Sequence, residues 1–69
     1  MMIAYVTCNS TYVVFGDECI AANARASDIV GATLAYPVDV GERLIFLRPG
    51  KERVVTTKVK AVIVSDNVA

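Results

Sequence analysis

Residues 52–64, ERVVTTKVKAVIV, are rich in the β-branched side chains that favour strands. Alternate side chains of a strand point to opposite faces, and here Lys58 and Lys60 both occupy even-numbered positions. We therefore expect the odd-numbered face to point inward: Val55, Thr57, Val59, Ala61 and Ile63. From residue 61 to residue 64 both faces are apolar, as in a central strand that is covered on each side.

The length of this segment predicts that it bends. Fully extended, residues 52–64 would span roughly 43 Å. A compact domain of 69 residues has a radius of gyration of only about 11 Å. We expect the first half to pair with residues 43–47 (RLIFL) across Pro49-Gly50, a pair suited to the centre of a type II turn. The second half is expected to pair with a hairpin formed by residues 2–7 (MIAYVT) and 12–15 (YVVF) around Asn9-Ser10.

The middle of the chain, residues 17–37, has two interpretations. Asp17 suits a helix N-cap, Glu18 suits a first turn, and four alanines favour a helix over residues 18–26. The alternative is a strand that pairs with YVVF through a two-residue turn at Gly16-Asp17. Residues 28–36 (DIVGATLAY) form either a second short helix broken at Gly31 or another strand, which ends before Pro37.

These elements predict an α+β fold in a single domain over residues 1–69. Its antiparallel sheet would have about four strands, from two hairpins with one short helix between them. The alternative is a small all-β barrel. With 55% hydrophobic residues and no net charge among 69 residues, the chain is unlike disordered sequences. A chain this short buries only about 60% of its unfolded surface, so we expect some apolar surface to be covered by a second copy or another protein.

The location expected by default is the cytoplasm. No stretch approaches 18 consecutive apolar residues, so no membrane span is expected. The uncharged run over residues 1–16 lacks the basic start of a secretory signal and is interrupted by polar residues. Two cysteines without an export signal are typical of free, half-buried thiols.

The composition argues against an enzyme. The chain has no histidine, so neither Cys8 nor Cys19 has the usual partner that forms a thiolate. Two thiols without CxxC spacing are too few for a structural zinc site, and the isolated glycines do not form a phosphate-binding loop. We expect no catalytic residue, no metal and no cofactor.

Charge is unevenly distributed along the chain. Residues 1–42 hold five acids against Arg25 alone, and residues 43–60 hold six bases against Glu52 alone. If the two groups occupy different surfaces, they can steer and orient a charged partner. The candidate partner-binding residues are the acids Asp17, Glu18, Asp28, Asp39 and Glu42 and the bases Arg48, Lys51, Arg53, Lys58 and Lys60.

Two classes of function fit this pattern. The favoured one is a protein-binding module that occupies a surface of a larger protein or protein–nucleic acid complex. The other is direct nucleic-acid binding, in which Arg43 and the five candidate bases contact phosphates along the 43–60 hairpin. A third alternative is a homodimer formed by pairing of strand edges, which would enlarge a small core.

In size and character the whole chain resembles the small phage-encoded inhibitors of bacterial defence, anti-CRISPR proteins among them. It shares with them a short single domain, a sheet with one helix, a lack of catalytic residues and separated charge. Such proteins commonly occlude a nucleic-acid or partner surface of a host complex. The resemblance therefore implies an inhibitor that acts in the host cytoplasm, although the zero net charge differs from the strongly acidic members that mimic DNA.

Overall fold

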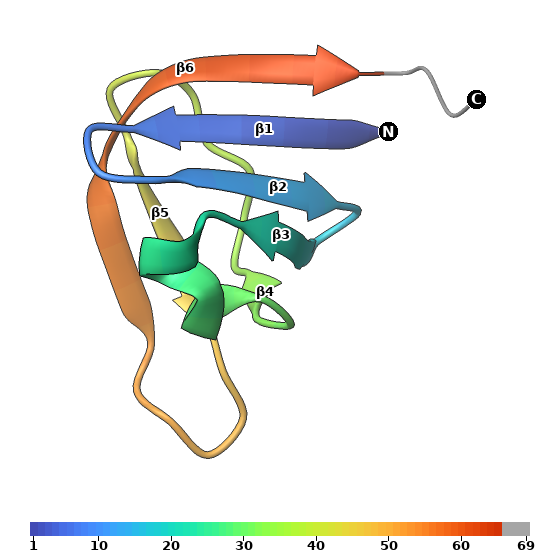
Figure 1. Ribbon diagram of the computed structural model, residues 1–69, viewed down its shortest axis with the longest axis vertical. Coiled ribbons are helices and arrows are strands. Elements are labelled where there is room, and N and C mark those ends of the chain that lie inside the picture. Colours follow the sequence, from blue (N-terminus) through green and yellow to red (C-terminus); the bar gives the residue numbers. More distant parts are fainter. Residues whose placement is uncertain (66–69) are drawn as a thin grey trace.

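The computed structural model describes residues 1–65, which form an all-β barrel with one short 3-10 helix (Figure 1). The strands are β1 (Met2–Thr7), β2 (Thr11–Phe15), β3 (Glu18–Ala22), β4 (Thr33–Leu34), β5 (Arg43–Leu47) and β6 (Val54–Ser65), and the helix is η1 (Ala24–Ile29). Each strand pairs antiparallel with the next, and β6 returns to pair with β1. The six described strands therefore close into a barrel.

The predicted α+β fold with an open sheet of about four strands is wrong, and the structure has the barrel that was its alternative. The error lies in the helix predicted over residues 18–26, whose first five residues form a strand and whose last three begin a short 3-10 helix. Residues 18–22 form β3, which pairs with β2 after a tight turn in which Gly16 has a φ of +65°. η1 begins only at residue 24, and residues 33–34 form β4.

Tertiary pairing explains why β3 is a strand despite its alanines. Helix propensities differ by only a few tenths of a kcal/mol per residue between most residue types. β3 covers the edge of β2 that β1 leaves open, and an uncovered edge would leave backbone groups unpaired. The same pairing buries Cys19 completely, at 0% exposure. The Asn23 side chain then accepts a hydrogen bond of 3.0 Å from the Thr11 amide, which holds the end of β3 beside the start of β2.

Both predicted hairpins are confirmed. β1 and β2 pair around a turn in which the Thr7 hydroxyl donates to the Ser10 carbonyl (2.9 Å) and accepts from the Ser10 amide (3.1 Å). β5 and β6 pair across Pro49-Gly50, where the Lys51 amide donates to the Arg48 carbonyl (3.1 Å). Gly50 has a φ of +70°, as the third position of a type II turn requires.

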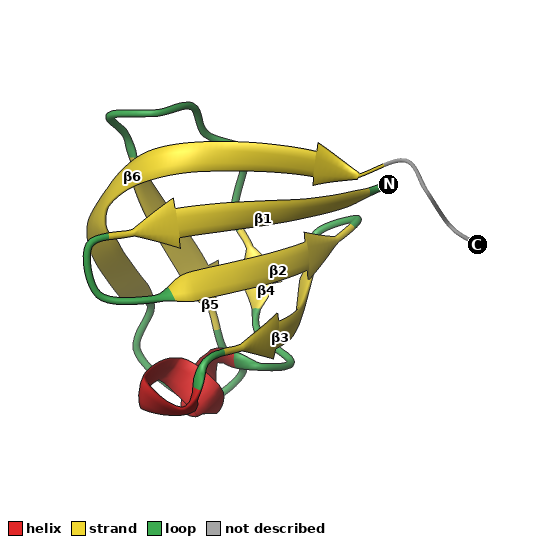
Figure 2. Ribbon diagram, turned by 45° about the horizontal axis from the view of Figure 1, so that its top comes forward, coloured by secondary structure: helices red, strands yellow, loops and turns green. Residues whose placement is uncertain are grey.

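β6 bends and changes neighbours, as its length predicts (Figure 2). Its first half pairs with β5 and its second half pairs with β1. The predicted inward face is correct at Val59, which is 2% exposed, but wrong at both ends of β6, because Val55 and Ile63 are 49% and 57% exposed and Thr56 is buried. Two bulges cause the difference, since each adds one residue to β6 and moves the inward positions by one.

The first bulge lies between Val55 and Lys58, which oppose Ile45 and Arg43. The second inserts Lys60 between Val59 and Ala61. The positions of β6 that are buried or packed against the core are therefore Val54, Thr56, Val59 and Val62. This spacing follows no single alternation, so one strand can line two parts of a closed barrel.

The core of the barrel is small and centred on two aromatic rings. Tyr12 and Phe46 pack with ring centroids 5.3 Å apart, and Tyr5 is 1% exposed beside them in the same buried cluster. The two thiols do not pair: Cys19 lies in this cluster, whereas Cys8 is exposed in the β1–β2 turn. Over residues 1–65, none of the helical structure is long and apolar enough to span a bilayer.

Candidate functional site

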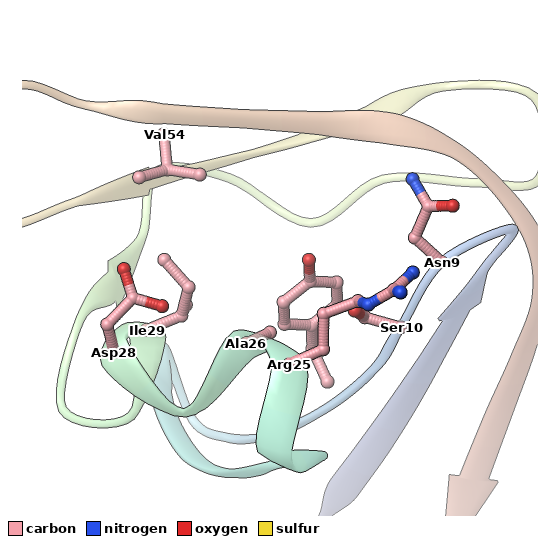
Figure 3. Close-up of a pocket in the computed structure, with 8 residues that line it drawn as sticks. Asn9, Ser10, Arg25, Ala26, Asp28, Ile29 and Val54 are labelled. Carbon is pink, nitrogen blue, oxygen red and sulfur yellow. The ribbon is translucent and has the colours of Figure 1, made fainter.

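One end of the barrel has two adjoining pockets between η1 and the loops around it. The larger, of about 350 Å³, lies beneath the start of β6 and is lined by the β1–β2 turn and by η1. Figure 3 shows the Arg25 side chain extending from η1 toward Asn9 and Ser10, with Val54 across the pocket. The smaller, of about 220 Å³, lies between η1 and the β5–β6 turn and shares Asp28 with the first.

Two of the predicted site residues, Asp28 and Arg48, meet at this end. Arg48 Nη1 lies 3.4 Å from Asp28 Oδ2, and Arg48 Nη2 donates to the Glu52 carbonyl at 3.2 Å. The Arg48 side chain is 21% exposed, whereas that of Asp28 is 69% exposed. The Arg48 guanidinium is therefore already bound by Asp28 and by the Glu52 carbonyl. This ion pair connects the acidic segment, residues 1–42, to the basic segment, residues 43–60.

The other predicted bases divide into two groups. Lys51 and Arg53 are exposed in the β5–β6 turn, beside the pockets. Lys58 is exposed on β6 opposite Arg43, beyond the first bulge, and Lys60 is exposed at the second bulge. The bases therefore do not form one continuous surface along the hairpin.

The remaining predicted acids lie in two separate places. Asp17 is exposed in the β2–β3 turn and Glu18 at the start of β3, whereas Asp39 and Glu42 are exposed in the connection from β4 to β5. Glu42 Oε1 accepts from the Asp39 amide (2.7 Å), and the Glu42 carbonyl accepts from the amide of Val59, the residue between Lys58 and Lys60 (2.8 Å). Within residues 1–65, acids therefore meet the basic segment at the Asp28–Arg48 pair and at the Glu42–Val59 bond, so these two groups of charges do not lie on wholly separate surfaces.

Burial disfavours ionisation of two groups in the core. Burial raises the pKa of the Cys19 thiol, with a smaller contribution from the Glu18 carboxylate and an opposing hydrogen bond at Ala21. Burial also raises the pKa of the Tyr5 hydroxyl, opposed by a hydrogen bond from the Val38 backbone and supported by the Asp39 carboxylate. Neither group is an accessible nucleophile.

A second surface lies on the outside of the barrel, where β6, β1, β2 and β3 lie side by side (Figure 1). Tyr5 and Thr7 of β1 are buried, so its alternate residues point outward. The register aligns the outward residues of neighbouring strands in three rows. Met2 lies opposite Phe15, Ala4 lies between Val13 and Ile63, and Val6 lies opposite Ala61.

We call this surface the outer apolar face. It consists of Met2, Ala4, Val6, Val13, Phe15, Ala21, Ala61 and Ile63. None of the eight is charged, and Phe15 and Ile63 are 50% and 57% exposed. Charged groups appear only at its rim, where Glu18 lies opposite Phe15 and Lys60 precedes Ala61.

Of the predicted site residues, only Glu18 and Lys60 adjoin this face, and its eight apolar members were missed. The sequence does contain a signal for it, because residues 61–64 are apolar on both faces and MIAYVT has an uncharged outer row. The first pattern was interpreted as a strand covered on both sides. In the structure, nothing within residues 1–65 covers the outer side, where Ile63 is exposed.

No family model, curated protein or solved structure matches the chain. The geometry of these two surfaces is therefore the basis for assigning a function.

Proposed function

We propose that this protein is a non-enzymatic protein-binding module that docks through the outer apolar face. The observation that supports this is the alignment of apolar side chains from four neighbouring strands. The middle row (Ile63, Ala4, Val13 and Ala21) is apolar on all four strands, and the rows beside it add Met2 with Phe15 and Val6 with Ala61. The face is exposed at Phe15, Ala21 and Ile63 and half-buried at its other five positions. A contiguous apolar surface that remains accessible typically marks a protein interface, and covering it is favourable by roughly 25 cal/mol per Å². Isolated exposed apolar residues would not need such an explanation.

Action by binding alone also fits the chemistry of the chain. It has no histidine, and Cys19, which is fully buried, has a raised pKa. Such a module acts by occupying the surface of its partner, which the sequence predicts to be a larger protein or protein–nucleic acid complex. The cytoplasm remains the proposed location, because an exposed unpaired thiol such as Cys8 suits a reducing compartment.

Direct nucleic-acid binding has less support. Single-strand binders stack bases on aromatic rings beside their basic groups. Here the one ring of the 43–60 hairpin, Phe46, is buried against Tyr12, and the exposed rings of Phe15 and Tyr36 lie outside that hairpin. Arg48 is paired with Asp28. Since the remaining bases fall into two groups, a continuous track for phosphates is also lacking along the described hairpin.

The proposal is tested by a charge placed at the centre of the face. Val13→Lys puts an ammonium group in the middle row, whereas the matched control Val55→Lys changes an exposed valine on the first half of β6. In affinity capture from the source cell, wild type and Val55→Lys should retain the same protein partner and Val13→Lys should lose it. Recovery of the same partner by folded Val13→Lys would contradict the proposal, and recovery of nucleic acid alone would favour the other function.

A further inference from the structure

We propose that the occupant of the outer apolar face is a second copy of this chain, and that the two copies form a symmetric dimer. This inference rests on the proposed function, because it keeps the outer apolar face as the docking surface, and it replaces the larger partner expected from the sequence with a second copy of the chain. It differs from the edge-paired dimer that the sequence suggests. β1 and β2, the two central strands of the face, are hydrogen-bonded along both edges, so at these strands the second copy must pack face to face rather than extend the sheet.

The charges of the chain favour self-association. The net charge is zero, so two copies do not repel each other over long distances. The rim of the face holds an acid and a base at opposite corners. Glu18 lies at the β3 side of the row that contains Met2, and Lys60 lies at the β6 side beyond the row that contains Val6.

This diagonal selects one symmetric arrangement. If the two-fold axis lies in the interface and crosses the Glu18–Lys60 diagonal at a right angle, Glu18 of each copy faces Lys60 of the other. The pair then occurs twice, because a two-fold interface is self-complementary. The strands of the two faces cross at close to a right angle, which is one of the two ways in which sheets pack. An axis along the diagonal would instead place Glu18 against Glu18.

The size of the face sets the expected affinity. Four strands spaced by about 4.8 Å, each contributing five residues at about 3.3 Å, cover roughly 19 × 16 Å. Two such faces have a combined footprint of roughly 600 Å², below the ~1,000 Å² of most specific interfaces. We therefore expect a weak, transient dimer and take a dissociation constant of about 1–100 μM as the working range.

The first arm of the test measures the oligomeric state by sedimentation equilibrium, from about 1 μM to 500 μM of the full chain, a range chosen to bracket the expected constant. Wild type and Val55→Lys should show a monomer–dimer equilibrium, whereas Val13→Lys should remain monomeric while keeping its circular dichroism spectrum. A wild type that stays monomeric throughout would overturn the second copy as occupant. In that case, loss of a captured partner by Val13→Lys would leave the proposed function standing, and its retention would remove both.

The second arm tests the orientation by exchanging the rim charges. Glu18→Lys should weaken the dimer roughly tenfold, since two exposed ion pairs become repulsive and each is worth about 0.5–1 kcal/mol. Adding Lys60→Glu to this variant should restore the wild-type constant, because the same two pairs form with reversed polarity. If Val13→Lys abolishes the dimer but neither charge variant changes its dissociation constant, the two-fold arrangement would be overturned.

Discussion

The backbone amide of Leu44 donates a hydrogen bond of 3.1 Å to the hydroxyl of Thr56 at the first bulge of β6. Both residues are buried, so no water replaces this bond. The Thr56 hydroxyl in turn donates to the Thr57 carbonyl (2.8 Å), and Arg43 Nη1 donates to the Thr56 carbonyl (3.1 Å). Side chains therefore supply bonds where the extra residue interrupts the regular ladder.

We predict that Thr56→Val lowers the free energy of unfolding by about 1–3 kcal/mol, because it leaves the buried Leu44 amide unsatisfied. Thr57→Val is the matched control. The Thr57 hydroxyl is buried without a hydrogen-bond partner in the described part of the chain, so its replacement by a methyl group should be neutral or stabilising. Urea titration of both variants checks this, and equal destabilisation would contradict the role of the bulge.

Stability should fall as the pH rises into the alkaline range. Burial raises the pKa values of Cys19 and Tyr5 in the folded protein, so the unfolded chain releases these protons first. Their contribution is complete below the pKa values of the unfolded groups. It is lost from about pH 8.5 for the thiol and about pH 10 for the phenol. Urea titrations at neutral and alkaline pH measure the loss, and a Cys19→Ala variant should lack its first part.

The two thiols should react at very different rates. Cys8 is exposed in the β1–β2 turn, whereas Cys19 is 0% exposed and has a raised pKa. Because the thiolate is the reactive form, a thiol reagent should modify Cys8 in the folded protein and reach Cys19 only on unfolding. Mass spectrometry after brief labelling should therefore find one modified cysteine in native protein and two in urea. Rapid native labelling of Cys19 would show that β3 opens.

The Asp28–Arg48 ion pair should contribute little to stability. Asp28 is 69% exposed and the closest nitrogen–oxygen distance is 3.4 Å, so solvent screens the attraction. Asp28→Asn should change the free energy of unfolding by about 0.5 kcal/mol or less. A double-mutant cycle with Arg48→Gln measures the coupling directly, and a coupling well above 1 kcal/mol would contradict this assignment.

Local signals made the two hairpins predictable. Asn9-Ser10 and Pro49-Gly50 are turn sequences, and the alternating apolar residues beside them act within a few positions of the chain. β3 could not be found in this way, because its strand conformation depends on pairing with β2 and on burial of Cys19 in a core that more distant strands complete. Local preference for a helix is too weak to oppose that pairing.

The outer apolar face was only partly predictable for a related reason. Its side chains come from four strands, and their alignment depends on register, including the bulge at Lys60. The apolar run from residue 61 to residue 64 correctly indicates that both sides of β6 avoid charge. It does not indicate which side the barrel fills and which side it leaves exposed.

The bulges of β6 also make this strand sensitive to its number of residues. Removing Lys60 would turn the side chains on one side of the deletion from the interior of the barrel to its exterior. Either Val62 or Val59 would then leave the interior. Changes of side chain on the exterior can accumulate without such a reversal. During evolution, exchange of amino acids should therefore be common at exposed positions of this strand outside the outer apolar face, such as Val55 and Lys58, whereas loss or gain of a single codon should be rare.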